Sequence, residues 1–400
     1  MIKKVNFKYL SLLSNHDKLN HNIRVYLLIQ SHDEFKQYID NQCAASIVNY
    51  LKLEEDLNDD LEFYDYSNYQ DMIPYSLIPD SVHTLVISPS KHSQNSGPRS
   101  RFQQSITKLY FYCHIERSEF VEEMLSHLPS KLETLSLQGY HFIGTPLSKR
   151  FVLPATLTEF TYQSNWDNLQ RFVAPPNKEL GATLLLNDDR PIEALEWMKL
   201  QTWVSGVDVI SNFHCFINDV LPTRLKHLRL PYHIYQLSRD KLPSSLKQLY
   251  MVNYNQGLLP HVLPNGLEGL CLWCFNQPLQ KDSLPQSLKN LHLSNYRKSF
   301  SSVGPLNNLQ RLVVKILNKS VSQLIANVKA MTIIFEKIDN DVTFQNTSLR
   351  ELCLLNNGST VIQLNSNILP PTLEKLKTAK IDILFPNSDS SEIQETDKLL

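Results

Sequence analysis

The chain has 400 residues, of which 42% are hydrophobic and 20% are charged, a composition typical of globular proteins. Its 39 Lys and Arg residues and 40 Asp and Glu residues leave a net charge of −1, so the chain as a whole has no electrostatic attraction to nucleic acids or anionic membranes. We therefore expect no nucleic-acid partner and no membrane partner. Ten glycines argue against glycine-rich phosphate-binding loops, and six cysteines are too few for a disulfide framework.

The beginning of the chain shows no targeting segment. Lys8 interrupts the apolar stretch near the start, which argues against a secretory signal. The sequence has no window of about 18 uninterrupted apolar residues, the length that a transmembrane helix needs. We therefore expect an intracellular, cytoplasmic protein with reduced thiols.

Residues 1–75 do not repeat, and we predict that they form a small helical cap. His32 to Leu53 has amphipathic helical spacing, and Asn22 to Gln30 is predicted as a second helix. Four residues of the longer helix are expected to be buried: Phe35, Tyr38, Ala45 and Val48. The acidic stretch from Glu54 is predicted as an exposed connection. Because a repeat array exposes an unpaired sheet edge, residues 1–75 are the natural cap.

Residues 76–380 repeat a short motif. The blocks LPTRLKHLRL, LPSSLKQLYM, LPNGLEGLCL and LPQSLKNLHL follow one another, and their anchor leucines lie 21 residues apart. The predicted anchors of all copies are residues 82, 106, 132, 157, 180, 204, 225, 246, 267, 288, 309, 328, 349 and 373. The copies at Leu180, Val204 and Val328 are degenerate. A fixed spacing over five copies, from Leu225 to Leu309, indicates a solenoid.

The motif L-P-x-x-L-x-x-L-x-L predicts one short strand in each copy. Its last two leucines are two residues apart, so both point to one face of a strand, and the proline favours a tight corner before it. Stacked copies bury these faces together in a parallel sheet. The fold class predicted is a leucine-rich-repeat-like solenoid with repeats of about 21 residues. Roughly ten residues remain between a strand and the next proline, which favours extended or 3₁₀ segments over helices there.

The end of the chain differs in composition from the repeats. From Pro386 it reads PNSDSSEIQETDKLL, which is polar and acidic. Such a segment cannot bury enough apolar surface to offset its ordering entropy. Residues 381–400 are therefore predicted to form a disordered tail.

A signature after one strand resembles a known repeat family. Phe275-Asn276-Gln277-Pro278 follows the block at Leu263 and is similar to the FNIP repeat, which is abundant in social amoebae and giant viruses of amoebae. Tyr254-Asn255-Gln256 is a partial copy, and Tyr296 and Tyr140 occupy the aromatic position alone. An ordinary leucine-rich repeat often has Asn or Cys here. We expect stacked rings to replace that buried Asn ladder. The resemblance covers roughly residues 76–380 and implies a leucine-rich-repeat-like fold.

The same resemblance suggests an alternative role for the beginning of the chain. Some FNIP and related proteins carry an F-box at this point, which would make the chain a substrate receptor of a ubiquitin ligase that recruits its adaptor through residues 1–75. The Leu-Pro opening of an F-box, followed by apolar helix residues, is not found here. This role is kept as the alternative.

The sequence contains no recognisable catalytic or metal-binding motif. Cys271 and Cys274 form a CxxC pair, but a zinc site needs two further ligands at comparable spacing, and none is evident. The sequence also has no HExxH, GxSxG, GxxxxGK[ST] or GxGxxG motif. We expect no cofactor, no metal and no enzymatic activity. An enzyme with an unrecognised site is kept as a second alternative.

The outward-facing strand residues are the candidate binding surface. They lie two, four and six residues after each anchor, and in register they form rows across the sheet, one of them Arg229, Tyr250, Cys271, His292 and Val313. The residues predicted to bind a partner are Arg229, Tyr250, Trp273, His292, His227, Gln248, Asn290 and Arg311. Arg, Tyr and Trp are the residue types that dominate interface energetics. We therefore predict a non-catalytic scaffold that binds an unidentified protein on this face. In the opposing interpretation, Tyr250 and Trp273 only cover neighbouring side chains.

Overall fold

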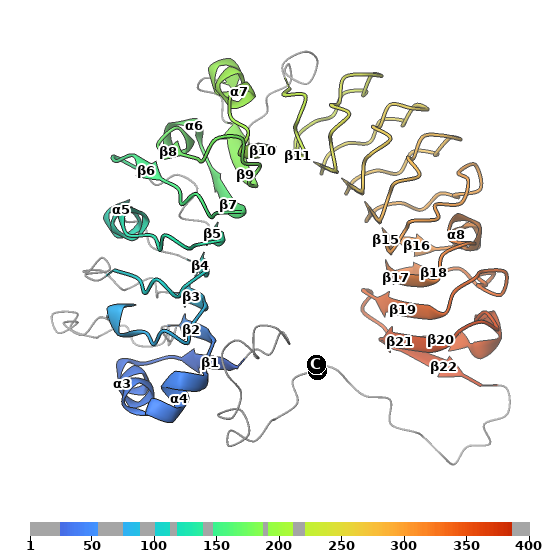
Figure 1. Ribbon diagram of the computed structural model, residues 1–400. Helices are drawn as coiled ribbons and strands as arrows, with labels where there is room; N and C mark the ends of the chain where they lie inside the picture. The colour runs from blue at the N-terminus through green and yellow to red at the C-terminus, as the bar shows by residue number, and fades with distance from the viewer. Residues whose placement is uncertain are drawn as a thin grey trace, which may run out of the picture. The chain divides into compact units, whose positions relative to one another are not determined.

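The computed structural model describes residues 25–54, 75–88, 101–112, 118–138, 147–186, 191–210 and 221–385 (Figure 1). The chain divides into two compact units, Met1–Val207 and Asp208–Leu400. Each unit consists of successive coils, and each coil contributes one strand to a parallel sheet. The predicted fold class, a solenoid with a long parallel sheet, is confirmed. None of the helices in these ranges is long and apolar enough to span a bilayer.

The first unit contributes eight strands, in an order that follows the chain. They are β1 (Tyr26–Ile29), β2 (Tyr50–Glu54), β3 (Thr84–Ser88), β4 (Lys108–Tyr112), β5 (Thr134–Gln138), β7 (Glu159–Ser164), β9 (Ala182–Leu186) and β10 (Val204–Val209), the last of which crosses the boundary at residue 207. The other elements are α3 (His32–Asp40), α4 (Gln42–Ile47), η2 (Tyr75–Leu77), α5 (Ser118–Ser126), α6 (Trp166–Leu169), α7 (Pro191–Lys199), and the parallel pair β6 (Phe151–Val152) and β8 (Phe172–Val173). Helices α5, α6 and α7 lie on the side of the coils opposite to the long sheet (Figure 1).

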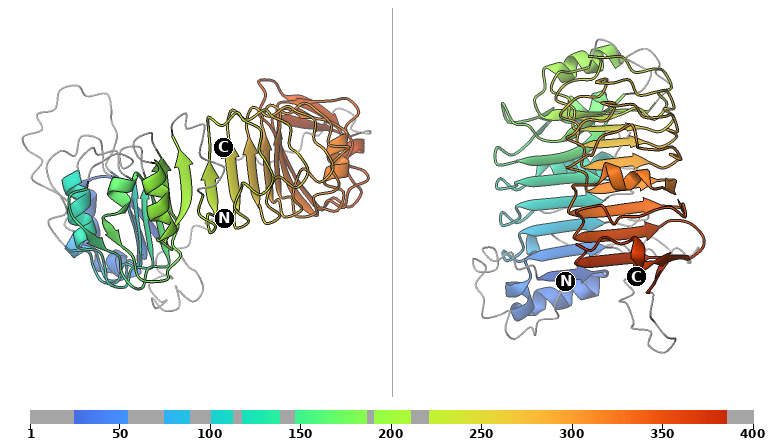
Figure 2. Two further views of the ribbon diagram at one scale, coloured as in Figure 1. Left: turned by 90° about the horizontal axis from the view of Figure 1, so that it is seen from above. Right: turned by 90° about the vertical axis from the view of Figure 1, so that its right-hand side faces the viewer.

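The second unit also contributes eight strands in chain order. They are β11 (His227–Arg229), β12 (Gln248–Met251), β13 (Gly269–Leu272), β14 (Asn290–Leu293), β15 (Arg311–Val314), β17 (Ala330–Phe335), β19 (Glu351–Asn356) and β21 (Lys375–Ala379), and they lie side by side (Figure 2). Two short parallel pairs lie elsewhere on the coils: β16 (Ile316–Leu317) with β18 (Lys337–Ile338), and β20 (Ile362–Asn365) with β22 (Ile381–Leu384). The helical pieces are α8 (Ser320–Leu324) and η4 (Ser366–Ile368).

The corner before each strand forms as the proline predicts. The N–H of Leu246 donates to the carbonyl of Pro243, and the N–H of Leu267 donates to that of Pro264, both at 3.0 Å. Both anchors are fully buried at 0% exposure. The section from β11 to β15, called the regular section below, contains no helix, in agreement with the predicted extended or 3₁₀ path.

Stacked aromatic rings fill the coils of the regular section. Tyr254, Phe275 and Tyr296 are fully buried. Ring centroids are 6.5 Å apart between Tyr254 and Phe275 and 6.0 Å apart between Phe275 and Tyr296, with interplanar angles of 8° and 12°. His233 extends the stack at 6.2 Å from Tyr254. The predicted ring ladder is confirmed for these three residues. Tyr140 lies outside the described residues.

The beginning of the chain differs from the prediction. The helix predicted over residues 22–30 is wrong, because Tyr26–Ile29 is strand β1, which pairs in parallel with β2. The helix predicted over residues 32–53 is confirmed only as far as Ile47, and there as two helices, α3 and α4. It breaks at Asn41, whose side chain accepts a hydrogen bond from the N–H of Ala44 and so starts α4. Residues 50–54 then alternate between half-buried and buried positions, the pattern of a strand. The repeating strands therefore begin within residues 1–75.

The expected burial within this segment mostly holds. Phe35, Tyr38 and Val48 are buried, whereas Ala45 is half-buried. Most of the acidic connection from Glu54 lies outside the described residues, as do residues 386–400. Residues 381–384 belong to the predicted disordered tail, but they form strand β22, which pairs with β20.

The register is as predicted in the regular section, whereas the predicted anchors of two degenerate copies do not match the pairing of the strands. His227 pairs with Gln248, and each following strand is offset by 21 residues as far as Arg311. Arg311 then pairs with Thr332, so the predicted anchor Val328 is two residues out of register with Leu309. Gln163 pairs with Thr183, a spacing of 20, whereas the predicted anchors Leu157 and Leu180 are 23 apart. In these two copies the predicted anchors therefore do not mark the residues that the sheet pairs.

Candidate functional site

The eight predicted binding residues lie on one face of the regular section, which is called the ladder face below. Along each strand, core positions are buried and the alternate positions are exposed or half-buried, except Gly269, which is buried. The first row, in order, consists of His227, Gln248, Gly269, Asn290 and Arg311, and the second row consists of Arg229, Tyr250, Cys271, His292 and Val313. Trp273 lies two residues after Cys271, at the end of β13. The structure therefore brings the eight residues together on one surface.

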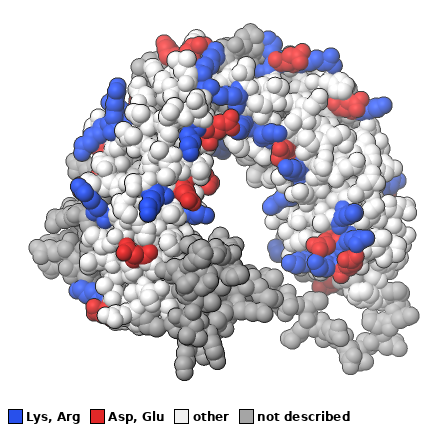
Figure 3. All heavy atoms as spheres, in the orientation of Figure 1, with Lys and Arg blue, Asp and Glu red and all other residues white. Residues whose placement is uncertain are grey.

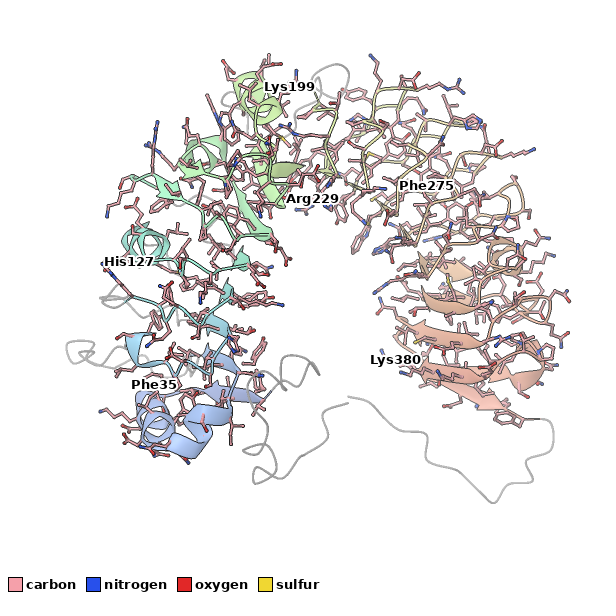
Figure 4. The ribbon with its side chains drawn as sticks, in the orientation of Figure 1. Phe35, His127, Lys199, Arg229, Phe275 and Lys380 are labelled. Atoms are coloured by element: carbon pink, nitrogen blue, oxygen red, sulfur yellow. The ribbon has the colours of Figure 1, made fainter. Side chains whose placement is uncertain are left out.

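Arg229 and Tyr250 are held in place by a buried carboxylate. Nη1 of Arg229 lies 2.9 Å from Oδ2 of Asp208, whose side chain is only 3% exposed. Cζ of Arg229 lies 5.0 Å from the centroid of the Tyr250 ring, which is a cation–π contact. The guanidinium is thus fixed between a carboxylate and a ring, and half of the Arg229 side chain remains exposed. Figure 4 labels Arg229 at this position.

Trp273 and His292 form a second aromatic pair. Their ring centroids are 5.6 Å apart with an interplanar angle of 35°. Nε2 of His292 also makes a short hydrogen bond with Oγ of Ser294. Burial and the charge of Arg311 lower the pKa of His292, which favours the neutral imidazole near pH 7. Trp273 remains 45% exposed although the pair orients its ring.

Gly269, which lies between Gln248 and Asn290 in the first row, leaves space on the ladder face for the side-chain amide of Gln248. A Cβ atom at Gly269 would lie 1.8 Å from Oε1 and 2.6 Å from Cδ of Gln248. The Gln248 amide therefore occupies the space that a side chain at residue 269 would take. Any larger residue at that position would have to displace Gln248 from the ladder face.

Three charged residues beside the first row were missed by the sequence interpretation. Nζ of Lys247 lies 3.1 Å from one carboxylate oxygen of Glu268, and Nζ of Lys289 lies 2.7 Å from the other. The hydrogen bonds from Lys289 and Lys247 lower the pKa of Glu268. These residues hold the same repeat position in three successive copies. Alternating charge at a spacing of 21 was the signal that could have revealed them.

Asp208 was also missed, although the repeat spacing points to it. It lies 21 residues before Arg229 and four after the predicted anchor Val204. Its row position is therefore the one that Arg229 holds in the next copy. Extending the outward-facing rows by one copy toward the N-terminus would have identified it.

The cysteines on this side of the second unit are free thiols. Cys271, Cys274 and Cys353 form no disulfide. Burial raises the pKa of Cys271 to about 11, so this thiol stays protonated and is a poor nucleophile near pH 7. Within the described ranges, no three His, Cys, Asp or Glu side chains are grouped in a way that could hold a metal ion. The arrangement of the ladder face is one that favours binding, with fixed rings and a fixed guanidinium.

Comparison with known protein families identifies the repeats. The FNIP Repeat family matches residues 236–274 and 275–303. Both matches lie in the regular section and contain the stacked rings Tyr254, Phe275 and Tyr296. No curated protein matches the chain.

Proposed function

Because the chain is an FNIP repeat-containing protein, we propose that it is a non-catalytic scaffold that binds a protein partner on its ladder face. Solenoid proteins use extended surfaces of this kind for binding. The observation that carries the proposal is Trp273, which directly follows strand β13 in the most regular part of the sheet, is 45% exposed and packs against His292. Pre-oriented aromatic residues reduce the ordering entropy that binding costs.

The charges of the ladder face favour a partner segment that combines apolar and acidic side chains. Arg311 is exposed at one end of the first row. The two positive charges of Lys247 and Lys289 are paired with the single negative charge of Glu268, so this group carries a net positive charge. On the visible face of the second unit, Lys and Arg are interspersed with Asp and Glu (Figure 3). A carboxylate beside an apolar anchor would therefore match Arg311 and Trp273 by electrostatic complementarity and by burial.

Proximity labelling in the native cell tests the proposal. The intact chain is compared with the Tyr250→Ala/Trp273→Ala variant, after thermal unfolding has shown that both are folded. The matched control is Tyr235→Ala/Leu259→Ala, which removes side chains of 51% and 47% exposure that lie outside the strands. We expect a defined set of neighbours to disappear only with the ladder-face variant. An unchanged set of neighbours, or the same loss in the control, would show that the ladder face is not the binding surface.

The ligase alternative requires residues 1–75 to recruit an adaptor. In the described part of this segment, Tyr26–Ile29 and Tyr50–Glu54 are paired within the sheet, which leaves helices α3 and α4 as the regular elements open to such a role. Capture of a ligase adaptor by the full chain, and its loss on substitution of the exposed residues of α3, would favour this role. Capture of neighbours through the ladder face alone would favour the scaffold.

A further inference from the structure

An apolar row crosses the sheet of the second unit beyond the regular section. It continues the second row of the ladder face, because His292 pairs with Val313. Its members, each paired with the one before, are Val313, Ile334, Leu355 and Ala379. The first three are half-buried and Ala379 is exposed. Apolar surface is therefore accessible on the successive strands β15, β17, β19 and β21 (Figure 1).

The first row of the ladder face continues beside the apolar row and has a positive charge at each end. Its members here, each paired with the one before, are Arg311, Thr332, Cys353 and Lys377. Arg311 and Lys377, called the cationic pair below, are both exposed. Neither forms an ion pair with another described residue. Because neighbouring strands are about 4.8 Å apart, three strand intervals separate the two cations by about 14 Å.

The carboxylates on this face are already paired with other lysines. Nζ of Lys375 lies 2.6 Å from Oε1 of Glu351, and Lys315 forms an ion pair with Glu336. These two ion pairs flank the two rows, one at the start of the strands and the other just after their ends. The face thus has an apolar centre and a charged rim, the usual anatomy of a protein interface. The cationic pair adds two positive charges that have no partner among the described residues.

We propose that these two rows bind a short extended segment of the partner, with two carboxylate side chains four residues apart and apolar side chains between them. Four residues of an extended chain span about 14 Å, which is also the separation of Arg311 and Lys377. Successive side chains of such a chain point to opposite sides. Residues one and five would therefore face the cationic pair, and residues two and four would cover the apolar row. The proposal rests on the scaffold function and deepens it by naming the chemistry of the partner.

A helix and a nucleic acid fit the two rows less well. A helix rises about 1.5 Å per residue, so its carboxylates would have to be about ten residues apart to reach both cations. A nucleic acid would bring phosphates to the cationic pair, but the apolar row offers no aromatic ring on which a base could stack. Glu351 and Glu336 would also repel its phosphates. An extended acidic and apolar segment satisfies both rows with the fewest residues.

Two synthetic peptides of equal composition test the spacing on the full chain. The peptide DLSLD, with glycine flanks and blocked termini, has its carboxylates four residues apart, whereas DLDLS has them two apart. Binding is followed through alkylation of the half-buried thiol of Cys353, which lies between the two cations in the first row. Cys274, a free thiol in the regular section, is the internal control. We expect DLSLD to protect Cys353 with saturation below about 1 mM, and DLDLS to bind about fivefold more weakly.

Each other result of this experiment overturns the proposal. Equal affinities for the two peptides would mean that the separation of the cations is not recognised. Equal protection of Cys353 and Cys274 would place the peptide elsewhere, and no saturable protection would mean that no such segment binds. Stronger protection of Cys353 by oligothymidylate than by DLSLD would mean that the ligand is a nucleic acid.

A charge exchange identifies the contact between carboxylate and cation. We expect Lys377→Glu to weaken the binding of DLSLD about tenfold. One of the two exchanged peptides, KLSLD or DLSLK, should then bind this variant better than DLSLD does, and it reveals the direction of the segment. Lys337→Glu is the matched control, because Lys337 is exposed on β18, outside the long sheet. An equal loss in the two variants, or no recovery with either exchanged peptide, contradicts the pairing.

The Tyr250→Ala/Trp273→Ala variant separates this inference from the scaffold function. Both substitutions lie outside β15 to β21, so DLSLD should bind this variant as it binds the intact chain. If the variant loses its neighbours in the cell but DLSLD binds neither chain, the scaffold function stands and this inference is wrong. If DLSLD binds with the expected spacing while the neighbours are unchanged, the later coils are a binding surface and the ladder face is not.

Discussion

The regular section and the first unit build the same kind of strand ladder on coils of different length. In the regular section every strand is offset from the last by 21 residues. In the first unit Tyr50 pairs with Thr84, a spacing of 34, and Lys108 pairs with Thr134, a spacing of 26. The long coils accommodate helices such as α5, whereas the short coils of the regular section contain none.

The difference shows that the core behind the sheet can be filled in two ways. In the first unit, side chains from helices fill it, among them Met124 of α5 and Leu195 and Met198 of α7, all at 0% exposure. In the regular section, stacked aromatic rings from successive coils do so, with Phe275, which is labelled in Figure 4, between Tyr254 and Tyr296. A single large ring in each coil thus takes the place of a helical turn. This exchange allows the coil to be short.

Removing the central ring should have the largest effect. Phe275→Ala leaves a cavity between Tyr254 and Tyr296, and we expect it to lower the free energy of unfolding by about 3–5 kcal/mol. Because the unfolding of a repeat array need not be two-state, hydrogen exchange in β12–β14 is measured together with urea unfolding.

Two controls separate the ring stack from general sensitivity of the region. Phe275→Tyr should cost less than about 1.5 kcal/mol. The hydroxyls of Tyr254 and Tyr296 donate to the carbonyl three residues later, of Gly257 and Ser299, and Pro278 offers the same carbonyl here. Trp273→Ala removes an exposed ring and should cost less than about 1 kcal/mol. Equal losses for Phe275→Ala and Trp273→Ala would mean that the stack does not support the short coils.

The same test in the first unit addresses the helix-filled core. Met124 is fully buried on α5, and we expect Met124→Ala to lower stability by about 2–5 kcal/mol. The loss of hydrogen-exchange protection should be confined to β4, β5 and their coil, because a solenoid transmits packing chiefly to neighbouring repeats. Glu123→Ala, at an exposed position of the same helix, is the control. An equal loss in β12–β14 would contradict the separate roles of the two cores.

The constant period explains why so much of the regular section could be predicted. Once the anchors Leu225 to Leu309 are aligned, the number of residues between a strand residue and its anchor determines the row of that residue and the face of the sheet on which it lies. Thus the positions of Tyr250 and His292 on one row, and the stack at Phe275, follow from counting alone. What counting cannot supply is the direction of a long side chain. The contact of Arg229 with the Tyr250 ring and the lateral position of the Gln248 amide depend on rotamers that the sequence does not encode locally.

Prediction failed at a strand that precedes the predicted repeats and at a degenerate copy of the motif. The pattern from Asn22 to Gln30 was interpreted as helical, but Tyr26–Ile29 pairs with β2 and becomes a strand through a partner 24 residues away. The copy at Val328 is degenerate, and this predicted anchor lies 19 residues after Leu309, whereas Arg311 pairs with Thr332 at the usual offset of 21. Tertiary pairing overrides local preference at the first site, and at the second the degenerate motif does not mark the residue that the sheet pairs.

Two glycines, one in the regular section and one in a later coil, differ in how closely neighbouring atoms pack against them. A Cβ atom at Gly358, which follows β19, would lie 2.8 Å from the backbone carbonyl oxygen of Glu336. At Gly257, in the regular section, it would meet nothing within 4 Å. We expect Gly358→Ala to cost about 1–3 kcal/mol because backbone atoms would have to move. Gly257→Ala should change stability by less than about 0.5 kcal/mol. Thermal unfolding of the two variants measures this difference, and equal melting temperatures would contradict close packing between the later coils.

The smallest expected effect is a pH dependence that arises from the ladder face. Burial lowers the pKa of His292 and of His227, and the neighbouring charges of Arg311 and Lys226 act in the same direction. The unfolded imidazole titrates near pH ~6.5, so between the folded and unfolded pKa values the unfolded state binds more protons. The stability that these residues contribute is therefore complete above pH ~6.5 and is lost as the pH falls toward the folded pKa.

Thermal unfolding tests this pH dependence. The melting temperature should fall as the pH is lowered from ~7.5 to ~5.5, a range above that in which carboxylates titrate. His227→Gln/His292→Gln should flatten this slope. His261→Gln, at an exposed position outside the strands, serves as the control. An unchanged slope in the double variant would mean that protonation of the ladder face is not linked to folding.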